Sequence, residues 1–390
     1  MSDREIYLDY AATSPVDPEV QAAMLECLRH EFGNPSSQHV AGRRARRLVD
    51  AARAAVATRV GAASEHLLFT SGATEANNLA LKGVLRRQRK ARPHLVTSRI
   101  EHKSVLDTAR ALEAEGVEVT YVDAETDGSV DPQRVAAALR TETSLVSIMH
   151  VNNETGVIQD VNAIGALCRD RGVLFHVDAA QSVGKLALRL AEAPIDLCSL
   201  TAHKVCGPKG VGALYVAPRT LLTAQLHGGE QERGLRAGTQ ATHQIVGMGR
   251  AYELADPELE APRISALRDR LWHELQAIPG VRQNGAPERR AAHVLNATFP
   301  GVDGESLRLA LRGVAVSAGS ACAADSPEAS HVLTGMGLSD VLAGSSLRFS
   351  VGRFTTKAEV VQAAAMVAAA VNRLRSAAKS APAWCSGSGF

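Results

Sequence analysis

The chain has 390 residues, of which 45% are hydrophobic and 22% are charged, and its formal net charge is +2. The composition is that of a globular protein with two domains or one large domain and a smaller companion. The charge gives no general attraction to nucleic acid or to an anionic membrane surface, and no apolar run approaches the ~18 residues of a membrane-spanning helix. The start lacks the pattern of a secretory signal, and the six cysteines show no C-x-x-C or zinc-type spacing. We therefore expect reduced thiols in a cytoplasmic protein.

Two basic runs, GRRARR at 42–47 and RRQRKAR at 86–92, lie next to helical sequence rich in alanine and leucine. A solvated helix face is the favoured interpretation, and a nucleic-acid site is the weaker alternative. The run at 42–47 is also a candidate for docking an acidic partner. We expect no direct nucleic-acid partner and no membrane partner.

From about residue 50 to 220, helical patterns alternate with short apolar runs rich in β-branched residues. These runs are HLLFT, HLVTS, VEVTYVD, SLVSIMHV, VLFHVDA, DLCSL and VGALYVA. Strands that alternate with helices predict a mainly parallel sheet covered on both faces. In such a sheet functional residues gather at the strand ends and in the loops that follow.

After about residue 250 the pattern is typical of a smaller α+β unit. The helical stretch ISALRDRLWHELQAI leads to the predicted strands HVLNATF and LRFSVG, and KAEVVQAAAMVAAAVNRLRSAA forms a last helix. The ending KSAPAWCSGSGF lacks periodicity and predicts a frayed tail. We therefore expect a large domain at 15–250, a small domain formed by 1–14 and 251–375, and a flexible tail at 376–390.

The stretch FTSGATEANNLALKG predicts a strand that ends at Thr70 and a helix that opens at Ala73. The free N–H groups and the dipole of such a helix start suit an anion, and the Thr74 hydroxyl adds a donor. Alone the signal is weak, because Thr74 can instead simply cap the helix.

Two further motifs place a charged residue at the end of a strand. Asp178 ends the strand of VLFHVDAAQSVGK, where a buried carboxylate needs a cationic partner, although an N-cap of a following helix is the alternative. Lys204 ends the strand of SLTAHKVCGPKG, where a lysine of lowered pKa can form an imine, although a surface lysine in a turn is the alternative. Thr201 and His203 are placed to bind a phosphate beside it.

Together, the phosphate cradle, the carboxylate and the lysine are what pyridoxal phosphate requires. The phosphate anchors the ring, the carboxylate keeps the pyridine nitrogen protonated and the lysine holds the aldehyde as an imine. Neither of the glycine-rich nucleotide strings, G-x-G-x-x-G and G-x-x-x-x-G-K-[ST], stands between a strand and a helix.

The stretch VSAGSACAADSPEAS at 316–330 places Cys322 among small residues. Such neighbours give little side-chain surface that could anchor the segment. We therefore expect a mobile loop that is disordered without a partner, rather than a cysteine used for packing.

Motifs along most of the chain point to one family. They are YLDYAATSPVDPEV, FGNPSSQH, FTSGATEANNLALKG, EHKSVLDT, VSIMHVNNETGVIQD, HVDAAQSVGK, HKVCGPKGVGALYV, HGGEQERGLRAGT and SLRFSVGRFTT. In these motifs the chain resembles the cysteine desulfurases of the IscS/NifS type, which are pyridoxal-phosphate-dependent enzymes of the class V aminotransferase family, over roughly residues 5–375. The resemblance implies an α/β protein of fold type I, the aspartate-aminotransferase-like fold. Its large domain would hold a mainly parallel seven-stranded sheet, and its smaller C-terminal domain would be α+β.

The resemblance also implies the cofactor contacts. Lys204 would hold the cofactor covalently, Asp178 would face the pyridine nitrogen, and Gln181 would hydrogen-bond the 3-oxygen of the ring. His102 would stack on the ring and help to move protons. The phosphate would be held by Ala73, Thr74, Thr201 and His203, joined by Thr239 from the partner subunit of a homodimer.

For the substrate L-cysteine, the resemblance implies that Asn153 lies near the ring and that Arg348 clamps the carboxylate, with Arg353 as the alternative. After Lys204 has removed the Cα proton, the Cys322 thiolate would attack the substrate sulfur, which leaves alanine and a persulfide. The acceptors would be iron–sulfur scaffold or sulfur-carrier proteins, for cluster assembly or tRNA thiolation. No metal site is expected, apart from a transient iron–sulfur ligand role of Cys322 in a partner complex.

The sequence departs from the family pattern at two places, and two rival functions remain. Thr201-Ala202 stands where Ser-Gly is frequent, and Cys206 has no family role, so packing is the expected one. An aminotransferase or a selenocysteine lyase would also keep Lys204 and Asp178 but would not need Cys322. A scaffold without catalytic activity that binds sulfur-transfer partners is a rival that is not an enzyme. It would have no chemical need for Lys204, Asp178, His102 and Cys322.

Overall fold

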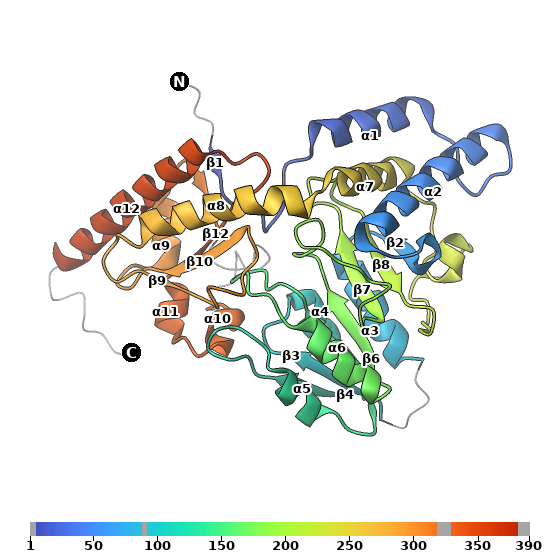
Figure 1. Cartoon of the computed structure of the whole chain (residues 1–390), viewed down its shortest axis with the longest axis horizontal. Coiled ribbons are helices and arrows are strands. Elements are labelled where there is room, and N and C mark those ends of the chain that lie inside the picture. Colours follow the sequence, from blue (N-terminus) through green and yellow to red (C-terminus); the bar gives the residue numbers. More distant parts are fainter. Residues whose placement is uncertain (1–4, 88–91, 318–328, 381–390) are drawn as a thin grey trace.

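A computed structural model describes residues 5–87, 92–317 and 329–380. Its centre is a sheet of seven strands in the order β2-β8-β7-β6-β5-β3-β4, with helices on both faces (Figure 1). The strands are β2 (Leu67–Thr70), β3 (His94–Ser98), β4 (Glu118–Val122), β5 (Thr143–Met149), β6 (Leu174–Asp178), β7 (Leu197–Thr201) and β8 (Gly212–Val216). The strand β8 is antiparallel to both of its neighbours, β2 and β7, and all other neighbouring pairs of this sheet are parallel. The predicted mainly parallel, seven-stranded sheet is confirmed.

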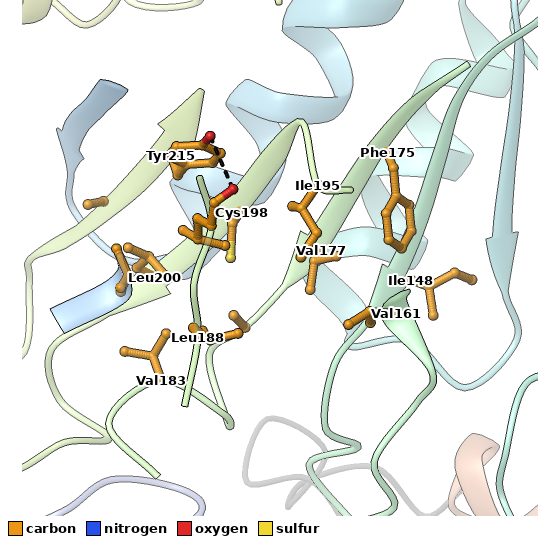
Figure 2. Packing of buried hydrophobic residues seen from close by; sticks show 14 of the residues in the cluster. Ile148, Val161, Phe175, Val177, Val183, Leu188, Ile195, Cys198, Leu200 and Tyr215 are labelled. Atoms are coloured by element: carbon orange, nitrogen blue, oxygen red, sulfur yellow. Dashed lines mark hydrogen bonds between the residues drawn. The ribbon is translucent and has the colours of Figure 1, made fainter. Parts of the chain in front are cut away.

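Side chains alternate between the two faces of the sheet along each strand, and each face has its own apolar cluster. In β7, Leu197 packs on one face with Leu145, whereas Cys198 and Leu200 pack on the other. Figure 2 shows part of the second cluster, in which Phe175 and other residues from the central strands pack together. Because both faces are buried, the strands are apolar throughout, as the short β-branched runs predict.

Helices from the first two thirds of the chain surround this sheet (Figure 1). They are α1 (Pro18–His30), α2 (Val40–Val60), α3 (Ala73–Leu85), α4 (Lys103–Ala114), α5 (Pro132–Ala138), α6 (Val161–Asp170) and α7 (Thr242–Leu254). Among them, α1 packs on α7. Apolar residues of α3 and α4 join the cluster on one face, and those of α2, α5, α6 and α7 join the cluster on the other. Two short 3-10 helices complete this part, η1 (Ser64–His66) and η2 (Gln231–Gly234).

The rest of the chain forms a second α+β region beside the first (Figure 1). Its strands are β1 (Ile6–Tyr7), which pairs with β11 (Val314–Ala315), and β9 (Arg282–Gln283), β10 (Val294–Thr298) and β12 (Ser346–Ser350), which form an antiparallel sheet. Its helices are α8 (Pro257–Leu275), α9 (Gly304–Ala310), α10 (His331–Gly335), α11 (Asp340–Gly344) and α12 (Lys357–Ser380). Among the residues that the structure describes, no helix is both long and apolar enough to span a membrane.

A third apolar cluster forms the core of this region. Phe299 and Phe349 pack edge to face, with ring centroids 6.3 Å apart, and Ile6 and Leu8 join them from the start of the chain. This packing supports the division at 1–14, 15–250 and 251–375, which stays a prediction. The helix α12 continues to Ser380, beyond the point at which the sequence pattern placed the start of the tail.

Candidate active site

A cavity of about 380 Å³ opens where β5, β6 and β7 end. Its wall also takes in the loop after β1, the starts of α3 and α4, and one residue of β12. Of the residues predicted from the sequence, those that line it are Ala73, Thr74, His102, Asn153, Asp178, Gln181, Thr201, His203, Lys204 and Arg348.

Three predicted residues are not among those that line the cavity. Thr239 is exposed and is not among the residues that line the cavity. Arg353 lines a smaller cavity and forms ion pairs with Asp17 at 2.8 Å and Glu260 at 2.7 Å, so the geometry favours Arg348 over Arg353 as the residue that meets a substrate. Cys322 lies outside the described residues, so the expectation of a mobile loop around it is not addressed by the structure.

The start of α3 forms one end of the cavity. No side chain caps this helix, whose N-cap is Gly72, so Thr74 does not have the capping role that was its alternative. The β8 strand passes close to this turn, and a Cβ on Gly212 would lie only 2.7 Å from the Cα of Gly72. Because Ala73, Thr74 and Glu75 line the cavity, the first turn of the helix offers its N–H groups and its dipole to an anion there.

Thr201 and His203 add polar groups to the same region. Thr201 is 1% exposed, and its Oγ1 is buried without a hydrogen-bond partner among the described residues. His203 Nδ1 lies 3.2 Å from Thr13 Oγ1. Burial and the charge of Lys204 lower the pKa of His203 to about 3, so its ring is neutral. A buried hydroxyl without a partner is costly, which suits a ligand that accepts its hydrogen bond.

Asp178 is connected to His102 by a chain of hydrogen bonds. Asn77 Nδ2 donates to Asp178 Oδ2 at 2.8 Å and to Ser104 Oγ at 2.8 Å, and Ser104 Oγ lies 2.8 Å from His102 Nδ1. Burial and the charge of Lys204 lower the pKa of His102. Because the Ser104 N–H also donates to His102 Nδ1 at 3.1 Å, the neutral ring carries its proton on Nε2.

The alternative role of Asp178 as a helix cap is only partly seen. Its Oδ1 accepts the N–H of Ala180 at 2.9 Å, as a capping carboxylate would. The residues that follow form turns rather than a helix, and Gly184 there has a φ of 70°, which favours glycine. The carboxylate is therefore a local turn acceptor as well as part of the cavity wall.

Arg348 brings a buried guanidinium to the cavity from β12. It is 1% exposed and donates from Nη1 to the backbone oxygen of Asn153 and from Nη2 to Asp9 Oδ1, each at 2.8 Å. The Arg348 Nε and the Asn153 Oδ1 are buried without a partner among the described residues. A bound carboxylate is the kind of ligand that such a guanidinium recognises.

Sequence reasoning missed several residues that support the site. They are Asp9, Asn77, Ser104, Lys185 and His293. Asn77 carried a signal, because it is a polar residue on the apolar face of a helix. Asp9 and His293 carried none, because their contacts lie more than a hundred residues away in sequence.

Comparisons with known proteins agree with this architecture. A sequence model of the family described as Aminotransferase class-V matches residues 6–362. The chain is 53% identical over 377 residues to the cysteine desulfurase IscS of Proteus mirabilis (strain HI4320), covering 95% of this chain and 93% of that protein. It is 54% identical over 377 residues to the cysteine desulfurase IscS of Tolumonas auensis (strain DSM 9187 / NBRC 110442 / TA 4), with the same coverage of 95% and 93%.

Solved structures share the fold. The structure titled "NIFS-LIKE PROTEIN" matches with a TM-score of 0.89 and 34% identity, over 95% of this chain and 100% of the other. The structure titled "SspA in complex with cysteine" matches with a TM-score of 0.81 and 38% identity, over 90% of this chain and 99% of the other. The chain therefore belongs to the aminotransferase class-V family, among its pyridoxal-phosphate-dependent cysteine desulfurases.

Proposed function

We propose that the cavity binds pyridoxal phosphate and with it removes sulfur from L-cysteine, giving L-alanine and a persulfide on Cys322. The family supplies the class of reaction, and the cavity supplies the residues. The observation that carries the proposal is the convergence of Lys204, Asp178 and the uncapped start of α3 on one cavity of about 380 Å³.

The residues of the cavity fit this cofactor. The N–H groups of Ala73 and Thr74, the Thr201 hydroxyl without a partner and the side chain of His203 are suited to the phosphate. The buried carboxylate of Asp178 is suited to a protonated ring nitrogen. His102, Gln181 and Lys204 would hold the rest of the cofactor.

The chemistry of the residues follows from these positions. When bound, the cofactor withdraws electrons from the substrate and makes its Cα proton acidic. The Lys204 amine would be the base that removes that proton at Cα. The neutral His102, with its proton on Nε2, would be able to give up that proton and take it back at the same atom. Arg348 would hold the substrate carboxylate, with Asn153 near the substrate, and so fix which bond faces the lysine.

Sulfur transfer requires the thiolate of Cys322. Its sulfur attacks the substrate sulfur, a new S–S bond forms and the C–S bond breaks. The Cβ atom of the substrate retains the electron pair of the broken bond and takes up a proton, and Lys204 returns a proton to Cα, so that alanine leaves and Cys322 holds a persulfide. No external oxidant is needed, because the substrate carbon is reduced as the sulfur is transferred.

The assembly and the acceptors are further parts of the proposal. We infer a homodimer in which Thr239 of each subunit completes the phosphate site of the other. Thr239 is exposed and does not line the cavity of its own chain, which supports this inference. The persulfide passes to iron–sulfur scaffold or sulfur-carrier proteins, and the protein works in the cytoplasm.

Incubation of the purified protein with pyridoxal phosphate, L-cysteine and a reductant tests the proposed function. Alanine and sulfide are expected in equal amounts. A keto acid product would favour an aminotransferase, and activity with selenocysteine alone would favour a selenocysteine lyase. A protein that forms no alanine and stays colourless after addition of pyridoxal phosphate would be a scaffold, and the proposal would be wrong.

Replacing Arg348 by lysine is expected to raise the KM for L-cysteine by about tenfold or more, because an ammonium group cannot reproduce the bidentate contact of a guanidinium. The charge is retained, so Asp9 keeps a cationic neighbour. Arg353→Lys is the matched control and is expected to leave KM nearly unchanged. Steady-state kinetics on both variants measure the difference, and an equal rise in KM for both would argue against Arg348 as the carboxylate clamp.

A further inference from the structure

A small second cavity lies behind the first. It has a volume of about 40 Å³, and its wall includes Lys185, His293 and Cys206. Lys204 lines both cavities, so it stands between them. Neither Lys185 nor His293 has a part in the chemistry described above, although both contact Gln181, which faces the first cavity.

The amide of Gln181 has only one reasonable orientation. Its Nε2 lies 2.8 Å from the backbone oxygen of Ala11, which can only accept a hydrogen bond, so the nitrogen must be on that side. Its Oε1 lies 3.2 Å from His293 Nε2 and 3.4 Å from Lys185 Nζ. The amide oxygen therefore sits between two groups of the second cavity that can donate to it.

The proton positions follow from burial. His293 Nδ1 is buried without a partner among the described residues, and a proton placed there would be an unsatisfied donor. The neutral ring therefore carries its proton on Nε2 and donates to Gln181. Burial and the neighbouring positive charges lower the pKa of His293 well below its usual range, which keeps the ring neutral.

Lys185 fits the same arrangement when its amine is uncharged. Its Nζ lies 3.2 Å from His293 Nε2, where a neutral amine tolerates the ring N–H and an ammonium group does not. Burial, followed by the charge of Lys204, lowers the pKa of Lys185 to about 7. The other charged or titratable groups that face Lys185 or its cavity are Tyr10, Cys206, Glu260, Arg348 and Arg353.

We propose that Lys185 and His293 are positioning residues, which donate to the amide oxygen of Gln181 and hold its NH₂ group toward the first cavity, where it donates to the 3-oxygen of pyridoxal phosphate. The inference rests on the proposed function, because it assigns the ring oxygen of that cofactor to Gln181. One amide hydrogen is used by Ala11, and the second is then available to the ring oxygen.

This arrangement has a spectroscopic consequence. A donor at the ring oxygen stabilises its anionic form and thereby lowers the pH at which the chromophore of the holoenzyme loses its proton. If the amide is no longer held, this stabilisation weakens. The midpoint of the pH-dependent change in visible absorbance then moves to higher pH.

The test is a pH titration of the visible absorbance of the holoenzyme. Lys185→Met keeps the length of the side chain and removes the donor, and its midpoint is expected to rise by about half a unit or more. Gln181→Ala is expected to show a similar rise, and the double variant little further change, because Lys185 acts through Gln181. Lys82→Met, on α3, is the control for loss of a lysine and is expected to leave the midpoint unchanged.

Two further variants separate positioning from a general effect on folding. Lys185→Gln restores an N–H donor and is expected to return part of the shift, and His293→Leu is an independent removal of the second donor with a shift in the same direction. The dissociation constant of the cofactor, measured on each apoenzyme, is expected to rise severalfold in Lys185→Met.

The outcomes separate this inference from the proposed function. An unchanged midpoint in both Lys185→Met and His293→Leu, or fully additive shifts in the double variant, would overturn the positioning role while the wild-type protein still produced alanine. A wild-type protein that neither binds the cofactor nor produces alanine would overturn the proposed function, and the positioning role with it.

Discussion

Lys204→Ala is expected to lower the rate of alanine formation by on the order of a thousandfold or more, because the variant lacks both the covalent link to the cofactor and the base that removes the Cα proton. Lys204 lies in the turn that follows β7, which ends at Thr201, and it lines the cavity together with Asp178 and Thr201. The substitution leaves these other cofactor contacts in place.

The covalent link between Lys204 and the cofactor can be tested without measuring activity, by absorbance and by borohydride reduction. Wild-type protein with pyridoxal phosphate is expected to absorb near ~400 nm and, after borohydride reduction, to carry the cofactor on Lys204 in a tryptic peptide map. The variant is expected to lack both signals, and Lys82→Met is expected to keep them. A reduced cofactor found on another lysine of the wild-type protein would contradict the assignment.

Cys322→Ser is expected to keep the visible absorbance and to lose nearly all persulfide formation, because a serine hydroxyl does not take up sulfur. The cysteines within the described residues are Cys27, Cys168, Cys198 and Cys206, and all four are buried. Burial also raises their thiol pKa values. A persulfide on any of these could not be passed to an acceptor protein without opening the core.

Mass spectrometry after alkylation of the persulfide locates the sulfur. Cys385→Ser is the control, because Cys385 also lies outside the described residues and lacks the family motif, and its persulfide yield is expected to match that of the wild-type protein. Persulfide that persisted in Cys322→Ser but disappeared in Cys385→Ser would show that Cys385, and not Cys322, is the nucleophile.

The parts of the site that could be predicted are those set by local pattern. The alternation of strands and helices predicted the parallel sheet, and the positions of Asp178 at the end of β6 and of Lys204 in the turn after β7 follow from that topology because parallel strands end at one edge. The start of α3 was also visible, as a Ser-Gly turn between a strand and a helix, although the sequence left open whether Thr74 caps it.

The parts that could not be predicted depend on contacts between distant segments. The pairs Arg348–Asp9 and Gln181–His293 join residues that no local periodicity relates. The hydrogen-bond chain through Asn77 and Ser104 needs α3 and α4 to pack side by side, which follows from the tertiary fold. The helix α12 ends at Ser380, slightly beyond the helical stretch that the sequence predicts up to Ala378.

The pairing of Asp9 with Arg348 has a consequence for synthesis. Asp9 is synthesised near the start of translation and Arg348 near its end. The strand β12 pairs with residues near the start of the chain and with β10. The central sheet, complete by Val216, can collapse while the later residues are still being translated. We expect that a nascent chain forms the phosphate-binding residues of the central sheet region first and places the Arg348 guanidinium last. It would then bind the cofactor before it can bind the amino-acid substrate.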